Sequence, residues 1–326
     1  MKAYLVKSTT STETVWSEHS LGDDSLSVDL AGLRLANPTM LASGILGYSS
    51  ASLESIVEGG AGAVVTKSVG LKPRKGYVNP TIVQAGCGLI NAMGLPNPGI
   101  DEFAKEIREA KTAVNTPLIV SVYGYSAQEY AKVARKAVDA GADAAELNVS
   151  CPHVEKTGSE IGQDPRILAE IVKRTKNAIP QSVIVKLSPD VTSIEEIAQA
   201  AVKAGADAIT AVNTVRAMAI DSETAMPILS NRRGGLSGPA IKPIALRCVY
   251  DIYERVKTPI IGCGGIANWK DAVEFMLAGA SAVQIGTAIA ARGPRVFKLT
   301  TDGIRRYSKR KGFKSVSEIV GLSHRR

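Results

Sequence analysis

The sequence predicts a (β/α)8 TIM barrel with extended loops at its C-terminal face and a short N-terminal extension. Short apolar, β-branched runs alternate with helical segments along the 326 residues, and eight such runs are the number that closes a parallel barrel. A local repeat, Gly-Ala-x-Ala, precedes four of these runs and is typical of a glycine that ends a helix before a tight turn. Several runs also end in polar side chains, as barrel strands do at the face that carries the active site.

The eight predicted strands are 39–42, 63–66, 118–122, 143–148, 183–186, 208–212, 260–262 and 282–285, and the repeat begins at Gly60, Gly141, Gly205 and Gly279. Two longer excursions, 70–98 and 216–242, follow the second and sixth strands. Their Gly, Pro and Asn residues favour irregular chain rather than additional helices. Residues 1–25, rich in Ser, Thr and charge, are expected to be an extension with partial disorder. Residues 26–326 are then one catalytic domain that ends in a basic helix.

Composition indicates a soluble, cytoplasmic enzyme-sized protein. The 45% hydrophobic content can fill a large core, while no apolar run approaches the length that a membrane helix needs. Four cysteines stand far apart, at Cys87, Cys151, Cys248 and Cys263. Their spacing predicts neither a metal site nor a disulfide framework.

The net charge of +8 is concentrated in one segment. Residues 304–326 hold eight Lys and Arg residues against one Glu, so the rest of the chain is nearly neutral. With only 5% aromatic residues, the chain lacks the stacking platforms of a single-strand binder. We therefore expect no nucleic-acid partner, although a binding module acting through this basic tail is an alternative.

Chemistry is expected at the strand ends. Lys67 and Lys186 each close an apolar strand, where an ammonium group can stabilise negative charge in a reaction; surface lysines are the alternative. Cys151 follows the fourth strand and can act as a base or nucleophile if its thiol reaches substrate, whereas most single cysteines are only buried apolar residues. His153 fits either a base or a polar loop contact.

Glycines after the last two strands predict a phosphate site. Gly264 and Gly265 follow the seventh strand, and Gly286 precedes Thr287 after the eighth. Exposed backbone N–H groups in these positions bind phosphate in many barrels, although tight turns alone would also require glycine. A phosphorylated substrate of a lyase or isomerase would fit such a site, as would FMN.

The motifs, taken in order, resemble those of class 1 dihydroorotate dehydrogenases over about residues 26–322. The matching segments are Asn37-Pro38-Thr39-Met40-Leu41-Ala42-Ser43-Gly44, Thr66-Lys67-Ser68, Asn91-Ala92-Met93-Gly94-Leu95, Asn148-Val149-Ser150-Cys151-Pro152, Val185-Lys186-Leu187-Ser188-Pro189, Asn213-Thr214, Gly235-Leu236-Ser237-Gly238-Pro239, Gly264-Gly265 and Gly286-Thr287. Segment 158–165 looks closer to class 1B than to the fumarate-using class 1A.

The resemblance implies FMN-dependent oxidation of dihydroorotate to orotate in pyrimidine biosynthesis. Cys151 would remove the C5 proton while the C6 hydride passes to flavin N5, and a positive Lys67 would favour the anionic reduced flavin. Cofactor-binding residues would be Ser43, Lys67, Ser68, Ser121, Asn148, Lys186, Val212, Gly238, Gly264, Gly265, Gly286 and Thr287. Substrate-binding residues would be Lys67, Asn91, Ala92, Met93, Gly94, Leu95, Asn148, His153, Asn213 and Thr214.

The resemblance also implies a homodimer that works beside a second, electron-transfer subunit carrying FAD and a 2Fe–2S cluster. Two positions depart from the family, which has Asn where His153 and Ser121 stand. The string Ser-Cys-Pro-His is shared with dihydropyrimidine dehydrogenase, a pyrimidine-reducing flavoenzyme and the nearest alternative. Its catalytic cysteine corresponds to Ile161 here, which favours orotate chemistry.

Overall fold

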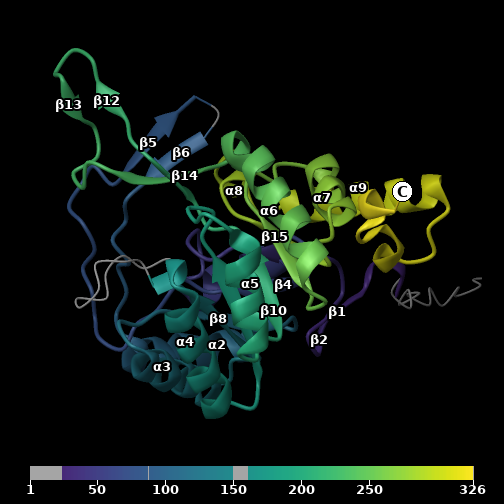
Figure 1. The fold of residues 1–326 in the computed structure, drawn as a ribbon, viewed down its shortest axis with the longest axis horizontal. Coiled ribbons are helices and arrows are strands. Elements are labelled where there is room, and N and C mark those ends of the chain that lie inside the picture. Colours follow the sequence, from purple (N-terminus) through teal and green to yellow (C-terminus); the bar gives the residue numbers. More distant parts are fainter. Residues whose placement is uncertain (1–23, 87, 150–160, 326) are drawn as a thin grey trace, which may run out of the picture.

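A closed barrel of eight parallel strands forms the centre of the molecule in this computed structural model, which describes residues 24–86, 88–149 and 161–325 (Figure 1). In sequence order the barrel strands are β3 (Thr39–Leu41), β4 (Ala63–Val65), β7 (Leu118–Val122), β8 (Ala144–Asn148), β9 (Ser182–Leu187), β10 (Ala208–Ala211), β15 (Ile260–Cys263) and β16 (Ala282–Ile285). The barrel closes where β16 pairs with β3, through Gln284 opposite Met40. These are the eight strands that the sequence predicts.

Helices surround the barrel and return the chain to the start of each next strand. They are α1 (Ser50–Glu58), α2 (Ile100–Ala113), α3 (Ala127–Asp139), α4 (Pro165–Ala178), α5 (Ile194–Lys203), α6 (Lys242–Arg255), α7 (Trp269–Leu277), α8 (Ala288–Arg292) and α9 (Val296–Lys311). Side-chain caps explain where several begin: Ser126 accepts from the Glu129 N–H, and Asn268 and Asp271 form a capping box.

The Gly-Ala-x-Ala repeat has the expected structural role. Gly60, Gly141, Gly205 and Gly279 all have positive φ, between 97° and 121°, directly before a barrel strand. Side chains are strained in this conformation, so glycine ends each helix and redirects the chain. The strands that follow are buried throughout and form one hydrophobic core with the inner faces of the helices.

The two chain ends add elements outside the barrel. After the short 3-10 turn η1 (Asp24–Leu26), strands β1 (Val28–Leu30) and β2 (Leu33–Leu35) form an antiparallel hairpin, fastened to β9 by a 2.6 Å hydrogen bond from the Ser182 hydroxyl to the Ala31 carbonyl. The sequence did not predict this hairpin. At the other end, α9 is followed by η4 (Val316–Ile319) and η5 (Leu322–His324).

The two excursions form strands where we expected irregular chain. Strands β5 (Ile82–Ala85) and β6 (Gly88–Asn91) come from the first, and β11 (Val215–Ala217) and β14 (Gly234–Ser237) come from the second; together they make an antiparallel sheet in the order β11-β14-β6-β5. We call this sheet the roof. It forms because β6 pairs with β14, a pairing between distant segments that local turn-forming residues do not reveal.

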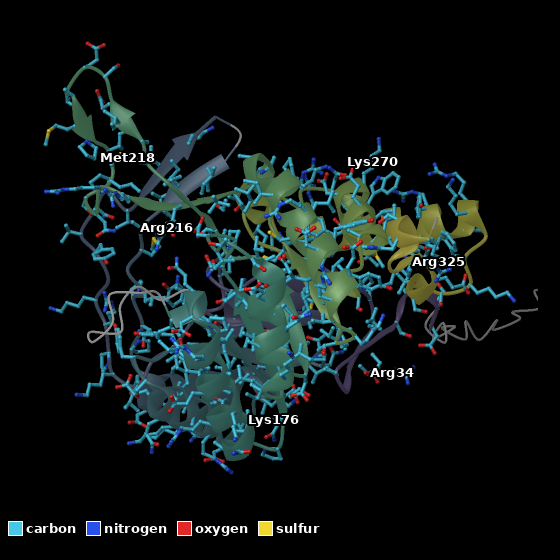
Figure 2. The ribbon with its side chains drawn as sticks, in the orientation of Figure 1. Arg34, Lys176, Arg216, Met218, Lys270 and Arg325 are labelled. Atoms are coloured by element: carbon cyan, nitrogen blue, oxygen red, sulfur yellow. The ribbon has the colours of Figure 1, made fainter. Side chains whose placement is uncertain are left out.

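A small hairpin extends the second excursion further. Its strands, β12 (Ile220–Asp221) and β13 (Met226–Pro227), project beyond the roof at the upper left of Figure 1. Arg216 and Met218 lie on the segment that leads into it (Figure 2). Within the described residues, no α-helix lies between β4 and α2 or between β10 and α6. The second excursion does contain one short 3-10 helix, η3 (Pro239–Ile241), which the expectation of irregular chain did not include.

Candidate active site

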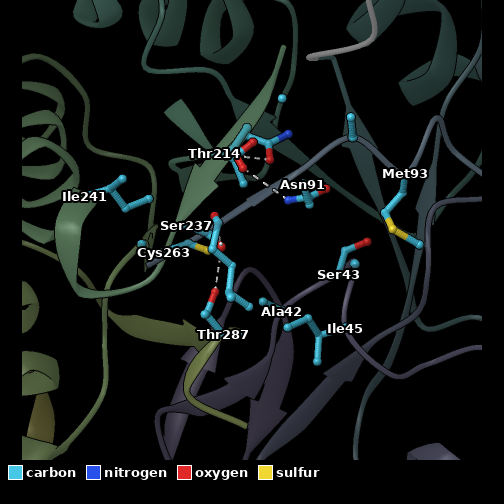
Figure 3. A pocket seen from close by; sticks show the side chains of 18 of the residues that line it. Ala42, Ser43, Ile45, Asn91, Met93, Thr214, Ser237, Ile241, Cys263 and Thr287 are labelled. Atoms are coloured by element: carbon cyan, nitrogen blue, oxygen red, sulfur yellow. Dashed lines mark hydrogen bonds between the residues drawn. The ribbon is translucent and has the colours of Figure 1, made fainter. Parts of the chain in front are cut away.

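A cavity of about 1060 Å³ opens between the carboxyl ends of the barrel strands and the roof. This volume is at the upper end of the range for small-molecule and cofactor sites. Barrel strand ends supply one side of its lining, and residues of all four roof strands supply the other. In Figure 3, Met93 borders the cavity on the side opposite Cys263.

The predicted site residues that the structure describes all line this one cavity. They are Ser43, Lys67, Ser68, Asn91, Ala92, Met93, Gly94, Leu95, Ser121, Asn148, Lys186, Val212, Asn213, Thr214, Gly238, Gly264, Gly265, Gly286 and Thr287. Cys151 and His153 lie outside the described residues. Their strand, β8, ends at Asn148, whose backbone carbonyl accepts a 2.7 Å hydrogen bond from the Tyr130 hydroxyl. Position in the cavity does not by itself assign a role, so the roles remain predictions.

One corner of the cavity is made of backbone that suits an anion. Gly264 and Gly265 have φ of +127° and +76°, which side chains rarely adopt, so the turn after β15 depends on glycine. Within the described ranges, the backbone N–H groups of Gly264, Gly265, Gly286 and Thr287 donate to no backbone carbonyl. Several partly exposed N–H groups that converge on a cavity are a common phosphate-binding arrangement.

The same corner is tied to the roof. The Thr287 hydroxyl donates a 2.8 Å hydrogen bond to the Ser237 hydroxyl at the end of β14, which Figure 3 shows as a dashed line. Ser237 also donates to the Leu89 carbonyl of β6, at 3.3 Å. The roof strand that leads into Gly238 therefore contacts the anion corner directly.

A cluster of small polar side chains lines the wall next to β4 and β7. The hydroxyls of Ser68 and Ser121 are 2.8 Å apart, the Asn148 amide donates to Ser68 at 3.1 Å, and Ser43 lies 3.4 Å from Ser68. Ser121 stands where the resembling family has Asn, and here its shorter hydroxyl is satisfied by Ser68. The departure therefore leaves no buried polar atom of Ser121 without a partner.

The bottom of the cavity is a charged network inside the barrel. Lys186 of β9 donates a 2.9 Å hydrogen bond to the Gln284 carbonyl oxygen, and the Gln284 amide donates to Glu146 at 2.6 Å. Thr210 of β10 donates to the same Glu146 oxygen at 2.9 Å. We call these four residues the floor. The Lys186 and Glu146 charges are 3.9 Å apart and almost wholly buried.

Lys186 and Lys67 differ in their surroundings. Burial alone would lower the pKa of Lys186, but the neighbouring Cys263 and Glu146 together hold the pKa above its usual value. Burial lowers the pKa of Lys67, for which the described residues supply no carboxylate within 4.0 Å. The Lys67 ammonium instead lies over the ring of Tyr48, 5.5 Å from its centroid. Lys67 is therefore the more easily deprotonated of the two cations.

Amide groups and one arginine organise the roof side. The Asn91 amide donates to the Gly235 carbonyl at 3.3 Å, and the Asn213 amide donates to the Asn148 side-chain oxygen at 3.4 Å. Arg74 donates to the Gly94 carbonyl at 2.7 Å and to the Tyr125 hydroxyl at 2.6 Å. Arg74 thus fastens the segment that carries Met93, Gly94 and Leu95 to a neighbouring loop.

Sequence reasoning missed Glu146, Gln284, Arg74 and Tyr125. Glu146 and Gln284 had a usable signal, because each is a polar residue with apolar, buried neighbours on both sides in its strand. Such a residue needs a partner across the barrel. Arg74 and Tyr125 had no comparable signal, because both stand in polar loops.

The donor set fits an anionic, planar cofactor better than a metal. Free N–H groups at one corner suit a phosphate, and two ammonium groups elsewhere suit a ring system that gains negative charge. The described ranges contain no group of three His, Cys, Asp or Glu residues placed to hold a metal ion.

Within the same ranges, no helix is both long and apolar enough to cross a bilayer.

Comparison with known proteins agrees with this site. Residues 25–307 match the family described as Dihydroorotate dehydrogenase. A relative from Pyrococcus abyssi named "Dihydroorotate dehydrogenase B (NAD(+)), catalytic subunit" is 52% identical over 298 residues, which are 91% of this chain and 99% of the relative. Relatives with the same name from Methanothermobacter thermautotrophicus and Methanosarcina acetivorans are 50% and 48% identical; they cover 92% and 91% of this chain, and 98% and 95% of their own lengths.

Proposed function

Because the chain belongs to the dihydroorotate dehydrogenase family and therefore oxidises dihydroorotate to orotate in pyrimidine biosynthesis with a flavin, we propose that the flavin is FMN and that both molecules bind in the roofed cavity. One observation carries the proposal: a single cavity combines a corner of free backbone N–H groups with two lysines and three asparagine amides. The first set suits a flavin phosphate, and the second suits an oxidised pyrimidine.

The barrel side holds the cofactor in this proposal. Its phosphate binds the N–H groups of Gly264, Gly265, Gly286 and Thr287. The remaining contacts come from Ser43, Lys67, Ser68, Ser121, Asn148, Lys186, Val212 and Gly238, which line the same cavity. Bound FMN supplies a two-electron acceptor at N5.

The roof side holds the substrate. Asn91, Asn148 and Asn213 each offer a donor and an acceptor, which together match the edge of a dihydropyrimidine. Ala92, Met93, Gly94, Leu95 and Thr214 complete this wall. His153 belongs to the substrate set by the family resemblance and lies outside the described residues.

Proton removal is assigned to Cys151. Its thiolate would take the C5 proton of dihydroorotate, and a bound flavin would supply the acceptor for the C6 hydride, so that the C5–C6 bond would become a double bond. Asn148, three residues earlier in the sequence, is held at the end of β8 by hydrogen bonds with Tyr130 and Ser68. Lys67 and Lys186 stabilise the negative charge that the electrons bring.

Partners are proposed from the relatives' names together with the family resemblance. Those proteins are catalytic subunits of an NAD-linked enzyme, so we propose a second subunit here that carries FAD and a 2Fe–2S cluster and passes electrons onward. A homodimer of this chain in the cytoplasm completes the assembly.

An anaerobic titration tests the function. The purified protein is expected to be yellow, and one equivalent of dihydroorotate should bleach its flavin. Cys151→Ala should keep the flavin and slow the bleaching by about a hundredfold or more, the scale for loss of a positioned base. Colourless protein, or unchanged bleaching in the variant, would refute the corresponding assignment. Bleaching by dihydrouracil in preference to dihydroorotate would indicate dihydropyrimidine dehydrogenase-like chemistry.

A further inference from the structure

The floor contains a carboxylate that the proposed reaction does not use. Glu146 lies in the middle of β8 and is fully buried. One of its oxygens accepts hydrogen bonds from Thr210 and Gln284. The other has no hydrogen-bond partner and lies 3.9 Å from the Lys186 ammonium nitrogen. Glu146 is therefore oriented toward Lys186 by side chains from two other strands.

Gln284 joins the two charges. Its carbonyl oxygen accepts from Lys186 at 2.9 Å while its amide donates to Glu146 at 2.6 Å, so the same side chain positions both. Gln284 is itself buried at the centre of β16 and lines the cavity, as Lys186 does. Only Lys186 and Gln284 of this network border the space where a ligand can bind; Glu146 lies behind them.

Stability alone does not explain a charged pair in this position. Replacing a buried ion pair with well-packed apolar residues is often neutral or stabilising, because two charges must be removed from water. Among the described residues, the other titratable group beside Lys186 is Cys263 of β15, which also raises the pKa of Lys186; burial raises the pKa of the Cys263 thiol, which favours its neutral form. Glu146 is the carboxylate that lies beside Lys186 in the described part of the chain.

We propose that Glu146 and Gln284 are positioning residues that keep Lys186 as an ammonium ion beneath the cofactor, so that its charge is in place before the electrons arrive. This inference rests on the proposed function. In native protein, reduction of the bound flavin should leave the protonation of Lys186 unchanged. When Glu146 is removed, the same reduction should add a proton to Lys186. Without its counter-ion, the buried lysine would be neutral beside oxidised flavin and would take a proton from solvent when the flavin gains two electrons.

The proton count can be measured from the midpoint potential of the bound flavin as a function of pH, at mildly alkaline pH. Glu146→Gln should take up about one proton more per two electrons than the native protein. Its midpoint potential should therefore fall more steeply with increasing pH. Combining it with Lys186→Met should abolish this additional uptake, because the group that accepts the proton is gone. Glu146→Asp keeps the charge and should restore the native count.

Asp207 offers a matched control. It pairs with Lys176 at 2.6 Å and accepts from the Val183 N–H at the opposite end of the barrel, away from the cavity lining. Asp207→Asn should retain the native proton count. A native count in Glu146→Gln, additional uptake that survives Lys186→Met, or an equal change in Asp207→Asn would each overturn the inference.

A second measurement needs no cofactor. If Glu146→Gln does not retain FMN, acylation of Lys186 by acetic anhydride can be followed by mass spectrometry in the flavin-free proteins. Lys186 should react at least about tenfold faster in Glu146→Gln than in native protein, since only the neutral amine is nucleophilic. Equal rates would refute the inference. Failure of the proposed function would look different, because native protein itself would then bind no flavin or would not be bleached by dihydroorotate.

Discussion

The floor and the roof border one cavity but are built in opposite ways. The floor consists of Glu146, Lys186, Thr210 and Gln284, which are fully or nearly buried and bonded to one another through side chains from four barrel strands. The roof is held by backbone pairing between two excursions and by a small apolar cluster around Ile90, and most of its strand residues are half-buried. The contrast indicates that barrel closure fixes the floor rigidly, whereas the roof can vary without disturbing the barrel.

Two isoleucines give the largest expected difference between these regions. Ile209 of β10 is fully buried in the barrel wall, whereas Ile82 of the roof edge strand β5 is 53% exposed. Ile209→Ala should lower the free energy of unfolding by about 2–5 kcal/mol, and Ile82→Ala by less than about 0.5 kcal/mol. Chemical denaturation measures both. Similar losses in the two variants would mean that the roof is part of the same cooperative core.

Two glycine variants test the anion corner separately from overall stability. Gly265 and Gly312 have nearly equal φ, +76° and +77°, but a Cβ at Gly265 would lie 2.7 Å from the Lys242 backbone nitrogen, whereas nothing lies within 4 Å at Gly312. Both alanine variants should lose about 1–2 kcal/mol of stability from the left-handed backbone. Only Gly265→Ala should also weaken flavin binding, by about tenfold or more, since the N–H groups must move.

Flavin retained after dialysis, measured by absorbance, distinguishes the two glycine variants. Normal retention in Gly265→Ala would remove this corner from the proposed phosphate site. Loss of flavin from Gly312→Ala would show that the test reports general destabilisation.

Asn91 tests the roof as the substrate side. Its side chain lines the cavity and makes one long bond, 3.3 Å, to Gly235. Asn91→Ala should lower kcat/KM for dihydroorotate by about tenfold, the effect of losing a buried hydrogen bond worth 1–2 kcal/mol. Flavin content should stay native, because the anion corner is untouched. Loss of flavin with unchanged kcat/KM per bound flavin would reverse the assignment of the two sides.

The smallest effect is expected at Tyr125. Tyr125→Phe removes one of the two bonds with which Arg74 fastens the segment around Gly94. KM for dihydroorotate should rise a few-fold, in keeping with a partly exposed hydrogen bond worth about 0.5–1 kcal/mol, and kcat should stay constant. Steady-state kinetics with dihydroorotate measure both KM and kcat. A fall in kcat at constant KM would place Arg74 in the chemistry instead of in loop positioning.

The sequence predicted the barrel better than the roof for a physical reason. A strand such as β4 is a continuous apolar run, and the glycine before it ends a helix locally, so a short segment contains the needed information. The pairing of β6 with β14 depends on where the barrel places two distant excursions. Local composition therefore predicted irregular chain where the structure has strands.

The site shows the same division. Lys67, Lys186 and the glycine corner were predicted from their positions at strand ends, a rule of the barrel. Glu146 stands out locally as a polar residue among buried ones, but its partner, Gln284, is 138 residues away, and no local pattern joins the two. The assignments of Cys151 and His153 stay predictions because both lie outside the described residues.

The β6–β14 pairing also has a consequence for the order of folding. Asn91 and Gly235, which face each other in this pairing, are 144 residues apart, and bringing such distant segments together costs substantial chain entropy. Local βα units can form first, because their contacts are short in sequence. We therefore expect the roof to form after the barrel strands β7, β8, β9 and β10, which lie between its two halves in the sequence, so that the cavity is enclosed late in folding.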